Sequence, residues 1–195
     1  MGFLDTLFGR TKTVKQVRPD RLFAMTTAYM DLDLSHGLST SGEAAIVFQP
    51  LATGDFNQIA DDMEAILRST GEESGTTVAR RDDDFGYRWM VLQTPEVDDQ
   101  VIGINAVMEA LQSGGYADRV LCAVFALKDR NAGVPVHLIY LAKRGTWYPF
   151  VPQAGAKERN RERELQLRAV LDPLMPIEPE MDRWYPLWGA PVGGS

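Results

Sequence analysis

An uninterrupted apolar run near the middle of the chain, residues 120–127, restricts the possible folds more than any other segment. Its eight residues, VLCAVFAL, include no charged or strongly polar side chain. Because successive side chains of a strand point to opposite faces, both faces of this segment are apolar. A strand of this kind belongs in the interior of a sheet that is covered on both sides. We therefore expect residues 120–127 to form the buried centre of a β-sheet.

Two further strands are predicted directly after this segment. Residues 129–133, DRNAG, are typical of a turn because Asn and Gly adopt positive φ angles easily. Residues 136–141 then predict an antiparallel return strand, and residues 146–150 a third strand after the short hairpin loop 143–145. The three strands would form a meander at the centre of the sheet.

The rest of the chain predicts helices that alternate with pairs of strands. Apolar and polar side chains alternate over residues 27–34, which predicts a half-buried strand with Ala28, Met30, Leu32 and Leu34 on one side. Further strands are expected over residues 43–49, 76–81 and 87–93, and helices from Pro19 to about Met25, over 55–69, from Asp98 or Asp99 to Ser113, and over 156–171. This order predicts an α+β fold with a mostly antiparallel sheet built from hairpins and with helices packed on it.

Two helices carry local signals of their own. Gly71 is expected to end the helix over residues 55–69, because glycine is common just after helices. The last helix begins with the mixed-charge stretch KERNRERE, which predicts a solvated face with i,i+4 ion pairs.

Composition restricts the class of protein. A chain of 195 residues with 45% hydrophobic content is long enough for one globular domain. Its formal charge of -7 argues against a general nucleic-acid binder, which is usually basic. Cys122 is the sole cysteine, so no internal disulfide can form and a reducing compartment is indicated. No apolar run reaches the roughly 20 residues that span a bilayer.

Residues 1–18 differ from the domain that we expect over residues 19–172. They carry an apolar face at helical spacing and four basic residues against one acidic residue. This amphipathic pattern suits contact with an anionic membrane or a partner groove. The other interpretation is that the face packs on its own domain. The apolar face consists of Phe3, Leu4, Leu7 and Phe8.

Residues 173–195 form an extended tail that is rich in proline and tryptophan. Its five prolines disfavour a helix, yet its large apolar side chains are unlike those of a disordered segment. We expect the tail to pack on the domain; the alternative is that its aromatic residues bind a partner. Those aromatic residues are Trp184, Tyr185 and Trp188.

Sequence motifs for catalysis or for cofactors are absent. The chain has no P-loop, no dinucleotide-binding glycine motif and no G-x-S-x-G. Its two histidines, His36 and His137, have no metal-ligand spacing, and the adjacent Asp82, Asp83 and Asp84 lack the spacing of an EF-hand. We expect no metal, no cofactor and no catalytic residues.

Basic and aromatic residues concentrate around the hairpin loop. Aromatic side chains next to Arg suit protein recognition, although ordinary strand packing beside a solvated basic turn explains the same pattern. The concentrated residues are Lys143, Arg144, Trp147 and Tyr148, with Tyr87 and Trp89 on another strand.

Several segments of the sequence resemble the family of the PspA-associated protein PspAB. The most specific are the basic and aromatic stretch KRGTWYPF, residues 143–150, and the tail stretch RWYPLWGAP, residues 183–191. The start MGFLD and the stretch DFGYRW, residues 84–89, also fit. Members of this family lie beside phage-shock-type membrane-stress genes, chiefly in actinobacteria and some archaea. The element order is similar to that of type III secretion chaperones and YbjN-like proteins.

The resemblance implies a non-enzymatic accessory protein of the envelope-stress response that binds PspA or a neighbouring membrane-stress protein. It would act in the cytoplasm, with peripheral contact to the inner face of the cell membrane. We expect its contacts to include the apolar face of residues 1–18, the hairpin residues and the tail aromatics. The alternative function is a small-molecule-binding protein or hydrolase with a site near Tyr87, Trp89, His137, Lys143 and Arg144.

Overall fold

The computed structural model of the chain describes residues 19–153, 155 and 157–193. Helices and antiparallel strand pairs alternate in it, which confirms the predicted α+β fold. The elements are α1 (Pro19–Leu22), α2 (Ala24–His36), β1 (Leu38–Phe48), α3 (Gly54–Ser74), β2 (Thr77–Asp82), β3 (Arg88–Gln93), α4 (Val97–Ser113), η1 (Ala117–Arg119), β4 (Val120–Asp129), β5 (Val134–Leu141), β6 (Thr146–Phe150), α5 (Arg161–Leu171) and η2 (Met181–Arg183).

Six strands form one antiparallel sheet in the order β2-β3-β1-β4-β5-β6. The predicted meander is present as β4, β5 and β6, and β1 joins it to the β2–β3 hairpin by pairing with both β3 and β4. Seven of the residues 120–127 are buried, and Leu121 is partly exposed. The apolar run therefore occupies an interior strand, as expected.

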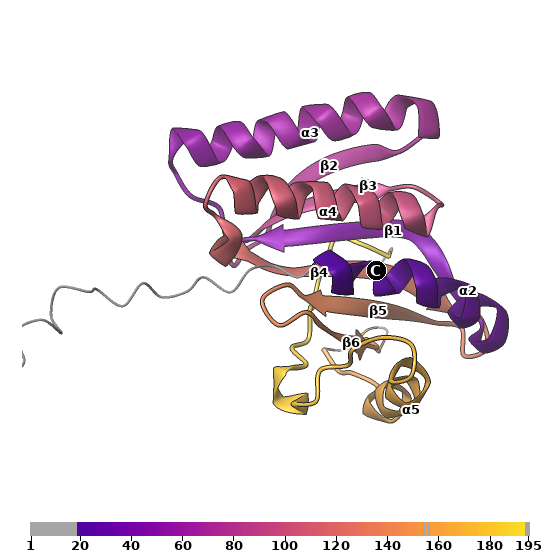
Figure 1. Cartoon of the computed structure of the whole chain (residues 1–195). Helices are drawn as coiled ribbons and strands as arrows, with labels where there is room; N and C mark the ends of the chain where they lie inside the picture. Colours follow the sequence, from indigo (N-terminus) through magenta and orange to yellow (C-terminus); the bar gives the residue numbers. More distant parts are fainter. Residues whose placement is uncertain (1–18, 154, 156, 194–195) are drawn as a thin grey trace, which may run out of the picture.

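Helices α2, α3 and α4 lie side by side over one face of the sheet (Figure 1). Aromatic rings pack between this layer and the sheet: the ring of Phe56 in α3 lies 5.9 Å from that of Phe48 in β1 and 5.1 Å from that of Tyr116. Helix α4 approaches β3 closely at Gly103, where a Cβ atom would lie 2.2 Å from Cδ2 of Leu92. Burial of these apolar side chains stabilises the layer.

The opposite face of the sheet is covered by residues that follow α5. Trp184, Ala190 and Val192 are buried there against apolar side chains of β1, β4 and β5. Near its end the segment crosses the central strands, since a Cβ atom at Gly193 would lie 3.1 Å from Nε2 of His137 in β5 and 3.2 Å from Cβ of Ala126 in β4. The yellow end of the chain in Figure 1 follows this path. A single extended segment thus replaces a second layer of helices.

The strand predicted over residues 27–34 is wrong, because these residues belong to helix α2. The helix buries Met25, Ala28 and Leu32, which recur at helical spacing, and leaves Met30 and Leu34 exposed. Gly37 ends the helix with a φ of 71°, and its N–H donates to the carbonyl of Asp33. Such a left-handed C-terminal residue is typical of helices.

Two helix boundaries also differ from those expected. Helix α3 continues through Gly71 to Ser74 and is ended by Gly75, which has a φ of 73°. Helix α5 begins only at Arg161, where the side chain of Asn160 accepts a hydrogen bond from the backbone N–H of Arg163. The predicted start at residue 156 missed this N-terminal cap.

Candidate partner-binding site

An ion pair between Arg144 and Glu178 joins the β5–β6 loop to the segment that follows α5. Arg144 donates from Nε to Oε2 of Glu178 at 2.5 Å and from Nη2 to Oε1 at 2.9 Å. The hydroxyl of Thr146 donates to the same carboxylate at 2.6 Å. The Glu178 side chain is fully buried. Arg144, which the sequence suggested as a partner contact, therefore binds the chain's own tail.

The charge of each partner is stabilised by the other. Burial alone would raise the pKa of the Glu178 carboxyl, but hydrogen bonds from Arg144 and Thr146 lower that pKa below its ordinary value. The hydrogen bond to Glu178 in turn raises the pKa of the Arg144 guanidinium. Both groups stay ionised around neutral pH, so the pair is a permanent link.

Trp147 is fully buried beside this ion pair. Its backbone N–H donates to the carbonyl of Pro176, and its carbonyl accepts from the N–H of Glu178, both at 2.8 Å. Its indole Nε1 donates to the carbonyl of Arg21 at 3.0 Å, and its ring lies 5.0 Å from that of Tyr140. Trp147 thus belongs to the core and ties the edge strand β6 to the tail.

The tail aromatics pack on the other face of β6. The rings of Tyr148 and Trp184 stack with 5.9 Å between centroids, and the Tyr148 hydroxyl donates to the carbonyl of Tyr185 at 2.9 Å. Trp188 meets the ring of Phe150 edge-on at 5.0 Å. Among these candidate residues Tyr148 and Trp184 are buried, Trp188 is half-buried and Tyr185 is exposed. The two aromatic stretches therefore bind each other.

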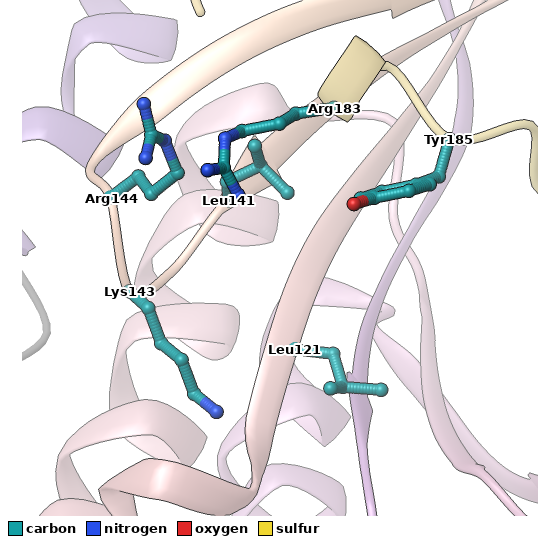
Figure 2. Close-up of a pocket in the computed structure, with 6 residues that line it drawn as sticks. All are labelled: Leu121, Leu141, Lys143, Arg144, Arg183 and Tyr185. Atoms are coloured by element: carbon teal, nitrogen blue, oxygen red, sulfur yellow. The ribbon is translucent and has the colours of Figure 1, made fainter. Parts of the chain in front are cut away.

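A shallow cleft remains open where the hairpin loop meets the tail (Figure 2). Leu121 comes from the start of β4, Leu141 from the end of β5, Lys143 and Arg144 from the loop, and Arg183 and Tyr185 from the tail. The cleft encloses about 250 Å³. It brings together three of the residues suggested by the sequence, namely Lys143, Arg144 and Tyr185.

Acidic neighbours neutralise much of the positive charge around the cleft. Arg144 and Arg183 both contact the carboxylate of Glu180, at 3.0 Å and 2.8 Å. The hydrogen bond from Arg183 lowers the pKa of the Glu180 carboxyl below its ordinary value. Lys143 is exposed and has no ion pair within residues 19–153, 155 and 157–193. The cleft therefore combines two leucine side chains, one tyrosine ring and a lysine that has no ion pair within the described residues.

Of the residues named for the alternative enzymatic site, Lys143 and Arg144 line the cleft, but Tyr87, Trp89 and His137 do not. Trp89 lies on β3 and His137 on β5, and β1 and β4 separate these strands in the sheet. Three strand spacings amount to roughly 14 Å. The indole of Trp89 donates to Oδ2 of Asp83 at 2.9 Å and is 5% exposed. Tyr87 and Trp89 thus support the β2–β3 hairpin and do not face Lys143.

Two buried side chains of types that often act in catalysis, His137 and Cys122, are held in unreactive protonation states. Burial lowers the pKa of His137 to about 4, so its imidazole is neutral at physiological pH. Burial raises the pKa of the Cys122 thiol to about 12, which disfavours the nucleophilic thiolate. Within the described residues, no group of three or more His, Cys, Asp or Glu side chains could hold a metal ion.

A sequence model of the family described as PspA associated protein B matches residues 1–192. The chain belongs to this family. The match confirms the resemblance, and it spans both aromatic stretches of this PspAB chain, residues 143–150 and 183–191. No curated protein and no solved structure matches the chain. Its likeness in element order to type III secretion chaperones and YbjN-like proteins stays a prediction.

Four residues predicted to contact a membrane or partner, Phe3, Leu4, Leu7 and Phe8, lie outside the part of this PspAB chain that the structure describes. Across residues 19–193, apart from 154 and 156, no helix is sufficiently long and apolar to cross a bilayer.

Sequence reasoning missed the acidic residues that organise this region. KERNRERE was interpreted as a solvated face, but Glu164 is fully buried and accepts from Nε of Arg159 at 2.8 Å. Arg159 also donates to the carbonyl of Trp184. Glu178 gave no recognisable signal, since its partner Arg144 lies 34 residues away. A buried carboxylate can be located only once the fold is known.

Proposed function

We propose that this PspAB chain is a non-enzymatic accessory protein of the envelope-stress response, which acts by binding PspA or a neighbouring membrane-stress protein. The family match over residues 1–192 carries this proposal, because the family is described by its association with PspA. The proposal places the chain in the cytoplasm.

The cleft at the hairpin supports binding by a short partner segment. Its volume of about 250 Å³ lies just under the lower end of the roughly 300–1,000 Å³ typical of small-molecule pockets, and it suits one or two side chains. Tyr185 is 56% exposed and Lys143 forms no ion pair within the described residues, so an apolar side chain followed by a carboxylate would complement both. Exposed aromatic side chains are enriched at protein interfaces.

Direct binding to purified PspA tests the proposal. The full chain is immobilised, and the affinity for PspA is compared between wild type and the double variant Lys143→Glu, Tyr185→Ala. The charge reversal and the loss of the ring should weaken binding at least about tenfold, which is 1.4 kcal/mol. The matched control is Lys157→Glu with Phe85→Ala, since both residues are exposed and lie outside the cleft.

Three results decide between the possibilities. If wild type does not bind PspA, the direct partner is a different protein. If the double variant binds as tightly as wild type, the cleft is not the contact. If the control variant loses as much affinity as the double variant, the effect is not specific to the cleft.

Residues 1–18 are proposed to give weak peripheral contact with the inner membrane surface. Each Lys or Arg close to an anionic surface contributes about 1 kcal/mol, and salt screens that contribution. When anionic vesicles are sedimented at low salt, wild type should therefore be found in the pellet with the vesicles. The double variant Phe3→Asp, Phe8→Asp should stay in the supernatant. Wild type that stays in the supernatant under these conditions excludes this contact.

A further inference from the structure

Helix α2 presents an apolar stripe that no other described part of the chain covers. Phe23, just before the helix, and Met30 and Leu34 within it follow one another at the spacing i, i+7 and i+11, with Thr27 between them. Their exposed fractions are 39%, 70% and 77%. The opposite side of the helix is buried against β1 and α4, so the exposure is confined to one face. A helix whose two faces are both apolar is normally covered on both.

The surroundings of this stripe are strongly acidic. Helices α1, α2 and α4 contain six Asp and Glu residues and one Arg residue, and α4 packs against both α1 and α2. Asp20 and Asp31 are exposed close to the stripe in sequence. Whatever covers the stripe should therefore combine an apolar face with positive charge, because like charges would repel it.

Residues 1–18 of the same chain have this combination. Their apolar face is followed by Arg10, Lys12, Lys15 and Arg18, which give the segment a formal charge of +3. Arg18 is bonded to Pro19, the first residue of α1. Residues 9–18 can span up to about 33 Å when extended, and Pro19 to Leu34 is about 22 Å along a continuous helix. The segment can therefore reach every part of the stripe.

We propose that Phe3, Leu4, Leu7 and Phe8 dock on the stripe of Phe23, Met30 and Leu34, with the basic residues 10–18 beside the acidic helices. The docking follows from the two complementary surfaces and does not depend on the accessory role proposed above. It competes with membrane contact, because both use the same four apolar side chains. The α2 stripe is thus a binding surface whose occupant is the chain's own N-terminal segment.

Cross-linking of the full chain tests the docking. The cysteine pair Leu7→Cys and Met30→Cys is introduced with Cys122→Ala, so that the buried native thiol cannot interfere. The control pair is Leu7→Cys with Ile66→Cys, since Ile66 is a similarly exposed apolar residue on α3, which α4 separates from α2 (Figure 1). We expect the first pair to form an intramolecular disulfide at least ten times faster than the control pair.

A second measurement detects docking without cross-linking. The rate of maleimide modification at Met30→Cys is compared between the wild-type N-terminus and the variant Phe3→Asp, Phe8→Asp, both with Cys122→Ala. Undocking should accelerate modification at least about fivefold, and modification at Ile66→Cys should not change. Equal rates at Met30→Cys, or equal cross-linking of both cysteine pairs, would overturn the proposal. Disulfides between two chains in place of one would assign the stripe to a second copy and overturn it too.

Discussion

The indole ring of Trp184 stacks on the phenol ring of Tyr148 with 21° between their planes. Trp184 lies in the segment after α5, and Tyr148 lies on β6, so the contact joins two stretches more than thirty residues apart. Trp184 also donates from Nε1 to the carbonyl of Glu178 at 3.0 Å. The tail therefore contributes to the core as an inserted layer, and its removal should affect the whole domain.

Replacing Trp184 by alanine should destabilise the protein by about 3–5 kcal/mol, as for other large aromatic residues in a core. The measurement is reversible urea unfolding. Tyr185→Ala is the control: that side chain is 56% exposed, and the hydrogen bond at this residue uses its backbone carbonyl. The control should lie within about 0.5 kcal/mol of wild type. Similar losses in both variants would show that the tail is only loosely attached.

Arg144→Ala should clearly destabilise the protein, because it leaves the buried carboxylate of Glu178 without its counter-charge. Arg183→Ala removes a cation from the exposed carboxylate of Glu180 and should cost much less, because solvent screens exposed ion pairs. Both variants are compared by thermal and urea unfolding at neutral pH. If Arg144→Ala is as stable as Arg183→Ala, the ion pair with Glu178 does not hold the tail.

The free energy of unfolding should fall with decreasing pH because of the buried His137. Its pKa is about 4 in the folded protein and 6.5 in the unfolded chain, so the unfolded chain binds a proton first as the pH falls. This group's contribution is fully present above pH 6.5 and is lost between pH 6.5 and 4, by at most about 3 kcal/mol. His137→Leu should flatten that part of the stability profile. An unchanged profile in His137→Leu would mean that the imidazole is already accessible to protons.

The rate of maleimide modification at Cys122 can be used to test whether the tail covers this face of the sheet. Cys122 is 6% exposed and lies on the face of the sheet that the tail covers. A maleimide should therefore modify native protein at least a hundredfold more slowly than protein in urea. Trp184→Ala should accelerate native modification, because local opening of the tail exposes this face. Rapid modification of native wild type would show that the tail does not shield Cys122 from solvent.

Much of the sheet could be predicted because its strands have local signals. The two-sided apolar run in β4 and the turn residues 129–133 identified the meander correctly. The strand prediction for residues 27–34 is wrong because Ala28 and Leu32 fit both the alternating pattern of a strand and the spacing of a helix. The exposed Met30 and Leu34 completed the alternation, so a docking surface on α2 was interpreted as the buried side of a strand.

The candidate site was predicted less well, since its contacts join distant residues. Lys143, Arg144 and Tyr185 do meet in one cleft. However, nothing local to Trp147 or Arg144 shows that the partner of each is the chain itself. The same residue types serve recognition between proteins and recognition within one, because the desolvation and stacking energies are the same.

The order in which the layers are synthesised follows from the position of the tail. All six strands precede residues 177–193, so a nascent chain can pair its strands while one face of the sheet is still open to water. Val47, Val124 and Ile139 then form an uncovered apolar surface on the growing polypeptide. Ribosome-bound intermediates of this protein should consequently attract chaperones that recognise exposed sheet faces, until the tail emerges and completes the fold.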